Sequence, residues 1–369
     1  MLYLDANATE PLRPEARAAM LVAADTVGNP SSVHAAGRAA RRILEDARES
    51  LATRFGARRA DIVFTSGGTE ANALAVHALG AGRRVIIGAT EHDAVRSATP
   101  DATILPVDRD GFADLPALAA LLADAAPALV CLMWANNETG VIQPIADAAA
   151  ICRHHGALLH VDAVQAAGRI PIEFGDVHSL AISSHKLGGP QGAGALLLTP
   201  EVAGISPMIH GGGQERGRRG GTHALPAIAG FAAAGLVKFG HDDAAAAKRF
   251  AAMRDAIEAA AISVGATVCG GNAPRLPNTT CLALPGIRAD AQVMALDLDG
   301  ICVSAGAACS SGKVAASHVL TAMGLGPLAG QAIRVSLPWN VTADAVPIFA
   351  AAYARMADRL RAALAPRAA

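Results

Sequence analysis

The segment AISSHKLGGP, residues 181–190, places a lysine just after an apolar run and just before two glycines and a proline. The run Leu180–Ile182 has the composition of a short buried strand, so Lys186 follows the point where a strand ends. Lysine is normally a surface residue, and this position therefore needs an explanation. Gly188 and Gly189 allow the chain to turn away without side-chain obstruction, which leaves the amine able to reach a ligand.

Short apolar strands and long alanine-rich helices alternate on both sides of this segment. Continuous apolar strands separated by helices predict an α/β fold with a mostly parallel sheet that is covered on both faces. The expected strands are 62–65, 85–87, 129–134, 158–161, 180–182 and 195–198. Later helices are expected at 226–239, 244–261 and 342–364, the last with Thr342 as its N-cap.

The pattern changes near residue 245, where a shorter α+β region begins. We expect a large domain over residues 13–245. A small domain is expected to combine residues 1–12 with 246–369. A chain of 369 residues is long enough for two such units.

Composition narrows the class of protein. Hydrophobic residues make up 52% of the chain and charged residues 17%, which excludes a disordered protein. The formal net charge of −1 argues against a general nucleic-acid binder. No apolar stretch has the length and continuity of a membrane span, and the first residues lack a basic start with an apolar core. We therefore expect a soluble cytoplasmic protein.

The six cysteines show neither a C-x-x-C pair nor zinc-ligand spacing, which is typical of free thiols in a reducing compartment. Cys152, His154 and His155 could suggest a metal site. Their position at a helix end before a strand favours a solvated surface instead, and no metal is expected.

Five polar residues follow five of the expected strands. They are Thr69, His92, Asn137, Asp162 and Lys186. Ligands of open α/β sheets bind at the carboxyl ends of the strands, so these side chains are expected to converge on one crevice.

Each of these groups can be explained by an ordinary structural role or by a functional one. The turn Ser66–Thr69 either caps a helix or binds a phosphate with free N–H groups. Asp162 either caps the next helix or holds a protonated ring nitrogen. Lys186 is either a solvated lysine or an amine that forms a Schiff base. A phosphate turn, an acidic partner for a ring and an imine-forming lysine are together what pyridoxal 5'-phosphate requires.

Longer stretches of the chain resemble the cysteine desulfurases of the NifS/IscS group, in the class V aminotransferase family of fold-type I pyridoxal phosphate enzymes. The resemblance extends over nearly the whole chain. It is carried by LDANAT (4–9), NPSSVHAAGR (29–38), ATEHDAV (89–95), NNETGVIQPI (136–145), HVDAVQ (160–165), SSHKLGGPQGAGAL (183–196), HGGGQERGRRGGT (210–222) and SAGAACSSG (304–312). It implies a seven-stranded, mostly parallel sheet between helices in the large domain.

The resemblance also implies roles for matching residues. Lys186 would bind the cofactor aldehyde and later move the substrate's α-proton. Asp162 would pair with the ring nitrogen, His92 would stack on the ring and assist proton transfer, and Gln165 would hydrogen-bond the ring oxygen. The phosphate would be held by Gly68, Thr69, Ser183 and His185, together with Thr222 from a neighbouring subunit; Asn137 and Arg334 would bind the substrate carboxylate.

Cys309 lies in a run of small and polar residues, unlike Cys131, which lies in an apolar run. This context alone leaves a reactive loop thiol and an inert one equally open. The resemblance implies that Cys309 is the nucleophile that takes sulfur from L-cysteine. Gly306 and Gly312 flank it and could serve as hinges.

The resemblance implies an enzyme that converts L-cysteine to L-alanine and leaves a persulfide on Cys309. The sulfur would pass to iron–sulfur cluster assembly or tRNA thiolation, and the enzyme would be a homodimer. Two alternatives stay open: a selenocysteine lyase or another class V enzyme, and a non-catalytic protein of the same fold. The sequence departs from the family after Arg334, where it reads Ser336–Asn340. The C-terminal residues do not match the tail that some members use to hold a scaffold protein.

Overall fold

The computed structural model describes residues 1–124, 126–172, 174–237, 244–306 and 316–364. Cys309 and the other residues of 307–315 lie outside this description. Its strands are β1 (Leu2–Tyr3), β2 (Ile62–Thr65), β3 (Arg84–Gly88), β4 (Thr103–Leu105), β5 (Ala128–Cys131), β6 (Leu158–Asp162), β7 (Ser179–Ser183), β8 (Gly194–Leu198), β9 (Thr267–Val268), β10 (Thr279–Ala283), β11 (Ile301–Cys302), β12 (Ser304–Ala305) and β13 (Ala332–Ser336). Its helices are α1 (Pro14–Ala24), α2 (Ala35–Phe55), α3 (Gly68–Leu79), α4 (Asp93–Arg96), α5 (Leu115–Leu122), α6 (Ile145–His154), α7 (Leu225–Leu236), α8 (Ala244–Ser263), α9 (Ala289–Leu298), α10 (His318–Ala322) and α11 (Ala345–Leu364).

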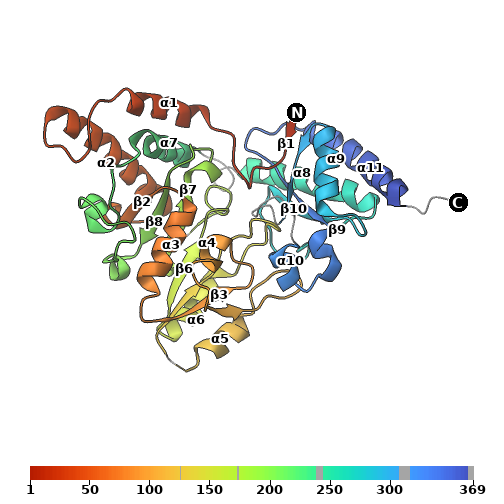
Figure 1. Cartoon of the computed structure of the whole chain (residues 1–369), viewed down its shortest axis with the longest axis horizontal. Coiled ribbons are helices and arrows are strands. Elements are labelled where there is room, and N and C mark those ends of the chain that lie inside the picture. The colour runs from red at the N-terminus through yellow and green to blue at the C-terminus, as the bar shows by residue number, and fades with distance from the viewer. Residues whose placement is uncertain (125, 173, 238–243, 307–315, 365–369) are drawn as a thin grey trace.

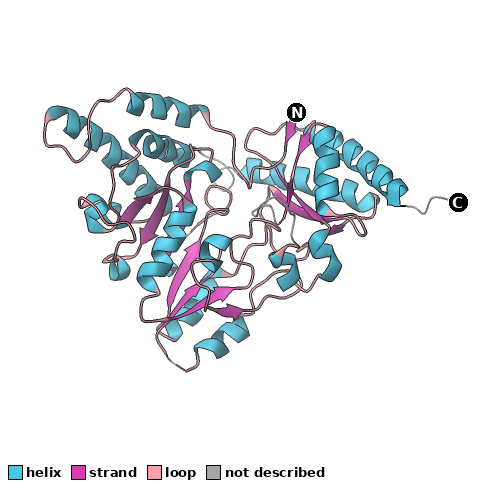
Figure 2. Ribbon diagram, in the orientation of Figure 1, coloured by secondary structure: helices cyan, strands magenta, loops and turns pink. Residues whose placement is uncertain are grey.

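The largest sheet has seven strands in the order β2-β8-β7-β6-β5-β3-β4 (Figure 2). Only β8 runs against its neighbours, pairing antiparallel with both β2 and β7. The expected mostly parallel sheet is therefore confirmed. The strand expected at 129–134 is shorter, because β5 ends at Cys131. Beyond it, Leu132 and Trp134 still donate N–H groups to the carbonyls of His160 and Asp162.

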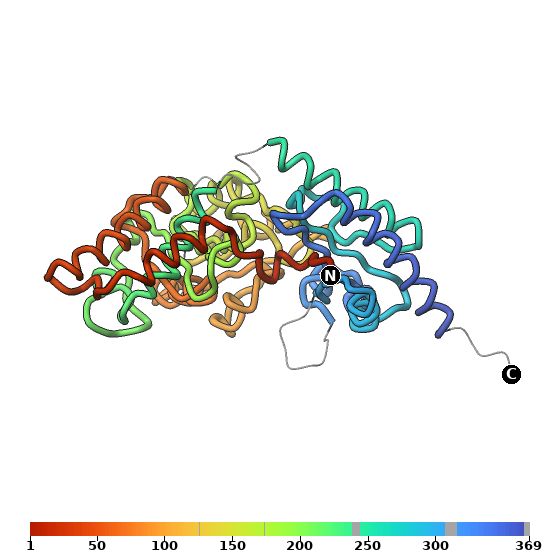
Figure 3. Tube along the Cα trace, turned by 90° about the horizontal axis from the view of Figure 1, so that it is seen from above, coloured from red at the N-terminus to blue at the C-terminus, as the bar shows by residue number. Residues whose placement is uncertain are grey.

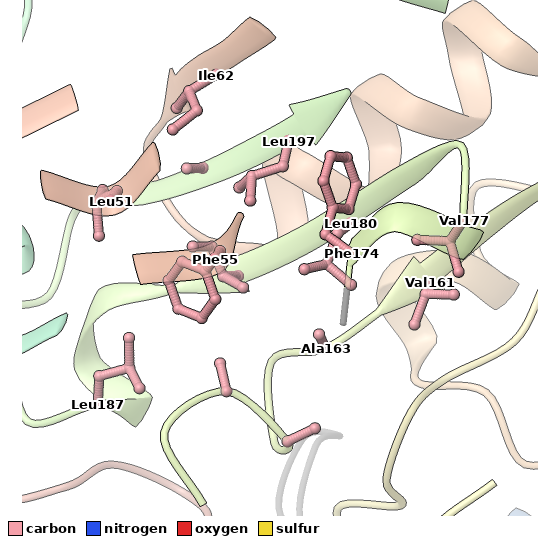
Figure 4. Packing of buried hydrophobic residues seen from close by; sticks show 14 of the residues in the cluster. Leu51, Phe55, Ile62, Val161, Ala163, Phe174, Val177, Leu180, Leu187 and Leu197 are labelled. Atoms are coloured by element: carbon pink, nitrogen blue, oxygen red, sulfur yellow. The ribbon is translucent and has the colours of Figure 1, made fainter. Parts of the chain in front are cut away.

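Alternating residues of this sheet enter two different apolar cores. Ile62, Val161 and Leu197 pack with α2 residues such as Leu51 and Phe55 on one face (Figure 4). The neighbouring strand positions, among them Val63, Ala181 and Leu196, pack with α3 on the other face. Burial on both faces explains why the strands are continuous apolar runs.

A second lobe contains a four-stranded antiparallel sheet, β12-β13-β10-β9, with α8 and α9 packed against it and α11 packed against those two helices. The N-terminal strand β1 joins this lobe, where Leu2 pairs with Ile301 in a short parallel ladder (Figure 1). Leu4 is part of the same apolar core as Phe349 and Tyr353. The view from above shows the first residues lying against the second lobe before the chain crosses to α1 (Figure 3).

Two helix ends differ from the sequence expectation. Helix α11 begins at Ala345 and not after Thr342, whose carbonyl accepts from the Ala345 N–H group at 3.1 Å. Starting at Ala345 keeps Pro347 in the first turn, where a missing N–H costs no helical hydrogen bond. Helix α7 ends at Leu236, three residues before the expected end.

Cys152 also departs from the sequence expectation. It lies in the last turns of α6 and is fully buried, although His154, two residues further on, is exposed. The interpretation of this segment as solvated surface was therefore wrong for the thiol. Within the described residues, no helix combines the length and apolar character that crossing a membrane requires.

Candidate active site

A cavity of about 350 Å³ lies at the carboxyl edge of the large sheet and reaches the second lobe. It is bordered by ten of the residues singled out above: Gly68, Thr69, His92, Asn137, Asp162, Gln165, Ser183, His185, Lys186 and Arg334. The parallel strands bring most of them together, because their carboxyl ends share one edge. Gly306 and Ser304 border the cavity from the second lobe.

Lys186 follows β7 at the end of a short 3-10 turn, and its side chain faces the cavity. Its amine donates to the carbonyl of Ala8 at 2.9 Å and to that of Asn7. Burial, together with the positive charges of Arg334 and Arg169, lowers the pKa of the amine to about 7. Lys186 can therefore supply an uncharged, nucleophilic amine near neutral pH.

Gly188 makes the turn after Lys186 possible. Its φ of +82° lies in the left-handed region, and a Cβ there would lie 2.7 Å from the Arg13 side chain. A residue with a side chain would be strained and would collide with Arg13. Both the left-handed backbone at position 188 and the contact with Arg13 therefore require glycine.

Asp162 is the last residue of β6 and is almost fully buried. One carboxylate oxygen accepts from the Val164 N–H at 2.9 Å, and the other accepts from the Asn72 side-chain amide at 2.7 Å. Burial raises the pKa of Asp162, while these hydrogen bonds and the nearby His92 and Lys186 hold it down. The carboxylate is therefore solvated by neutral donors of the protein.

The start of α3 forms the part of the cavity that suits an anion. A Cβ at Gly68 would lie 2.6 Å from the Val164 side chain and 3.3 Å from Ser183, so only glycine fits. The Ser183 hydroxyl is buried and has no hydrogen-bond partner. An unpaired hydroxyl beside free N–H groups at a helix start is available to a phosphate oxygen.

His185 borders the same region as Ser183. Its Nδ1 lies 3.2 Å from the Thr9 hydroxyl. Burial lowers the pKa of His185 to about 4, assisted by the charges of Lys186 and Arg169. The ring is accordingly neutral at physiological pH.

His92 and Gln165 both make contacts with the protein itself. His92 caps α4, where its Nδ1 accepts from the Ala94 N–H at 3.0 Å, so Nε2 carries the proton. Gln165 donates to the Asn7 carbonyl at 2.9 Å and accepts from Arg169. Its second amide hydrogen is the part of Gln165 left for a ligand.

Arg334, in β13, reaches the cavity from the second lobe. It donates to Asp5 at 2.6 Å and to the Asn137 carbonyl at 3.0 Å, while its buried Nε has no partner. The guanidinium, which has five N–H groups, thus keeps donors that these two partners do not use. This is the group of the cavity best suited to a ligand carboxylate.

Thr222 is exposed and does not border the cavity of its own chain. It ends the loop 210–222, in which Glu215 and Arg216 have left-handed backbones with φ of 49° and 59°. Glu215 holds the loop to the large lobe through Arg48 and the Phe64 N–H group. Glu215, one of the two strained residues, is therefore held by a buried ion pair.

Three residues without a sequence-based role support the site. Asn7 accepts from both Lys186 and Gln165 through its carbonyl, Asn72 holds Asp162, and Arg169 contacts Gln165. Asn72 could have been noticed, because it lies one helical turn after Thr69 and is polar in an apolar helix. Nothing local in the sequence marks the other two.

Comparisons with known proteins agree with this geometry. The model of the class V aminotransferase family matches residues 2–349. A cysteine desulfurase from Cereibacter sphaeroides is 41% identical over 98% of this chain and 97% of its own. The structure of a NifS-like protein from Rickettsia africae superposes with a TM-score of 0.89 at 36% identity, over 97% of this chain and 99% of that one. A protein called SspA, solved in complex with cysteine, has a TM-score of 0.79 at 27% identity, over 93% of this chain and 100% of its own.

Proposed function

The chain belongs to the class V aminotransferase family, and from this membership we propose that it is a pyridoxal 5'-phosphate-dependent cysteine desulfurase. The observation that carries the proposal is that Lys186 and Asp162 border one cavity, with an amine whose pKa is lowered to about 7 and a carboxylate that neutral donors solvate. The similar enzymes named above support the reaction.

The cavity fits the cofactor on its own residues. The unpaired Ser183 hydroxyl and the crowded Gly68 at the start of α3 suit the phosphate. Asp162 suits a protonated ring nitrogen, because a buried carboxylate is stabilised by a positive partner. Lys186 suits the aldehyde. We propose that Thr69, His185 and, from a neighbouring subunit, Thr222 complete the phosphate site, with His92 and Gln165 beside the ring.

The cofactor supplies an aldehyde that condenses with amines and a ring that delocalises negative charge from the adjacent carbon. With the cofactor bound, Lys186 would be the cavity's base, able to hold and move the substrate's α-proton. Asp162 keeps a proton on the ring nitrogen. Arg334 and Asn137 orient the substrate through its carboxylate.

The substrate is proposed to be L-cysteine, and SspA is a similar protein solved with that amino acid. The thiolate of Cys309 attacks the substrate sulfur. The carbon–sulfur bond breaks, a sulfur–sulfur bond forms, and protons complete L-alanine, so that cysteine and an enzyme thiol give alanine and an enzyme persulfide. No oxidant is needed.

Finer features of the function are proposals as well. The persulfide sulfur passes to iron–sulfur cluster assembly, through a scaffold protein, or to tRNA thiolation. The enzyme works as a cytoplasmic homodimer. Residues 13–245 form the large cofactor-binding domain, and 1–12 with 246–369 form the small domain that carries Cys309.

The test is an absorbance spectrum of the purified protein before and after addition of L-cysteine, with alanine assayed. We expect a visible cofactor band that changes with cysteine, together with alanine. Cys309→Ser is expected to keep the band and lose alanine production. Alanine formed at the parent rate by Cys309→Ser would refute the nucleophile. A strong preference for selenocysteine, or formation of a keto acid, would favour the alternative class V enzymes, and a colourless protein the non-catalytic one.

A further inference from the structure

A chain of buried side chains runs from Asp162 away from the cavity. The Asn72 amide donates to Asp162, the Asn72 carbonyl oxygen lies 2.9 Å from Nε2 of His160, and Nδ1 of His160 lies 2.8 Å from the Ser179 hydroxyl. Asn72, His160 and Ser179 are each at most 1% exposed. All three are buried, so groups of the protein must satisfy their hydrogen bonds; Asn72 alone also borders the cavity.

The chemistry of the groups sets the direction of these hydrogen bonds. An ionised Asp162 can only accept, so the Asn72 amide nitrogen must face it and the Asn72 carbonyl must face His160. Nε2 of His160 must then carry the proton. Burial lowers the pKa of His160 to about 3, so the ring has a single proton and Nδ1 accepts from Ser179. Every donor therefore points toward Asp162.

A protonated Asp162 would reverse the whole chain. It could donate to the Asn72 carbonyl, the amide would turn its nitrogen to Nε2, and the His160 proton would move to Nδ1 facing Ser179. The side-chain network thus has two complete arrangements, and each belongs to one charge state of Asp162. Only the first arrangement gives Asp162 a hydrogen bond to its charged form, and such charge-assisted bonds are the stronger ones, so the chain favours the ionised carboxylate.

Asp162 needs such support because its surroundings oppose its charge. Burial is the largest influence on Asp162 and raises its pKa, as it does for the neighbouring buried Glu91. On the favourable side are His92 and Lys186. Above pH 7 the Lys186 amine is largely uncharged, so the hydrogen-bond donors of the protein then carry more of the stabilisation of Asp162.

We propose that Asn72 and His160 are positioning residues that hold Asp162 ionised and aimed into the cavity, through a hydrogen-bond chain in which His160 carries its proton on Nε2. The inference deepens the proposed function and rests on it for the role of Asp162. Ser179 ends the hydrogen-bond chain furthest from Asp162, so a substitution there should affect the hydrogen bonds to Asp162 least.

The first test needs no variant. Nitrogen NMR of the histidine-labelled full-length protein with pyridoxal phosphate bound is expected to show one histidine that stays neutral from pH 5 to 9 with its proton on Nε2. Assignment uses His160→Gln, in which that signal disappears. A proton on Nδ1, or a His160 that becomes charged in this range, overturns the inference. The measurement does not depend on turnover, so it is separate from failure of the proposed activity, which would show as absence of alanine.

The second test replaces Asn72 by Leu, which has a similar size and no donor, and by Asp, which keeps an acceptor for His160 but opposes Asp162. We expect both to weaken cofactor binding and lower kcat by roughly ten- to a hundredfold, the range for losing a hydrogen bond to a charged group, with KM for cysteine little changed. His160→Gln, which can still donate to Asn72, is expected to be milder than His160→Phe.

Equal effects of His160→Gln and His160→Phe, or parent-like cofactor binding and kcat in Asn72→Leu, overturn the inference. The cofactor's visible band provides a further readout, because its position and pH dependence follow the charge on the ring. A folded Asn72→Asp protein whose band titrates like the parent also contradicts it. If the Asn72 variants do not fold, the inference is decided by cofactor binding and kcat in Ser179→Ala and by the His160 tautomer in the parent protein.

Discussion

The two walls of the cavity differ in the partners of their charged side chains. The large-sheet wall, made of Asp162, Ser183 and Lys186, contains no direct ion pair. Asp162 accepts from an amide and a backbone N–H, and Lys186 donates to backbone carbonyls. The small-sheet wall, made of Ser304, Gly306 and Arg334, has its one charge already paired, because Arg334 lies 2.6 Å from Asp5.

The difference indicates two kinds of binding. Neutral partners leave the charges of the large-sheet wall available to a resident group with charges of its own, which suits a cofactor that stays. An existing ion pair makes the small-sheet wall nearly neutral before the substrate arrives. A ligand carboxylate there can use the guanidinium donors that Asp5 and the Asn137 carbonyl leave free, and it shares the positive charge with Asp5, which suits a substrate that must also leave.

Removal of Lys186 should have the largest effect. Lys186→Ala loses both the amine that binds the aldehyde and the group that moves the proton, and proton transfer alone contributes roughly 10²- to 10⁴-fold. We expect kcat to fall by at least that factor and the visible cofactor band to shift. The exposed Lys248→Ala serves as the matched control and should keep parent activity. If Lys186→Ala formed alanine at a rate within tenfold of the parent, the proposed role of Lys186 in aldehyde binding and proton transfer would be contradicted.

The convergence of the large-sheet wall could be predicted from the sequence, because polar residues follow continuous apolar strands and parallel strands end at one edge. What could not be predicted is the support from distant segments. The Asn7 carbonyl reaches Lys186 across 179 positions, and Asp5 reaches Arg334 across 329. No local pattern of charge or hydrophobicity encodes such contacts. The later start of α11 was likewise decided by Pro347, which carries more weight than the Thr342 signal.

Changes on the small-sheet wall should act on substrate binding. Arg334→Lys loses the fork geometry, and the loss of a charge-assisted hydrogen bond corresponds to roughly a ten- to hundredfold higher KM for cysteine. Asp5→Asn should do the opposite and lower KM a few-fold, because the guanidinium is no longer shared. Steady-state kinetics measures both, with the exposed Arg355→Ala as control. If Asp5→Asn raises KM as much as Arg334→Lys, Asp5 positions the arginine and does not compete with the substrate.

The pH dependence of cofactor capture should distinguish the walls further. Burial lowers the pKa of Lys186 to about 7, so the amine is protonated and unreactive below this pH. The rate at which the cofactor-stripped full chain regains its visible band should rise about tenfold per pH unit below 7 and level off above it. A rate that continues to rise up to pH 10 would indicate an ordinary lysine. Arg334→Lys should leave this profile in place, since its positive charge remains.

The smallest effect is expected at Gly306, on the small-sheet wall. A Cβ there would lie 2.3 Å from Oε2 of Glu138, which also accepts from the Ser317 hydroxyl at 2.6 Å. The carboxylate is buried and cannot move aside without losing Ser317. Gly306→Ala should therefore lower the free energy of unfolding by about 1–3 kcal/mol, the usual cost of overpacking.

A double-mutant cycle shows whether Glu138 is the cause. In a Glu138→Ala background the alanine at 306 has room, so its cost in urea unfolding should fall to a fraction of that in the parent. Gly330→Ala is a matched control, because a Cβ at Gly330 meets no atom within 4 Å. Equal costs in the two backgrounds would place the constraint in the backbone of Gly306. Relief by Glu138→Ala would mean that the buried Glu138 carboxyl, next in sequence to Asn137, fixes Gly306 and Ser317, which lie on either side of the segment that contains Cys309. The small-sheet wall would then depend on side-chain contacts, whereas the large-sheet wall depends on the ends of strands.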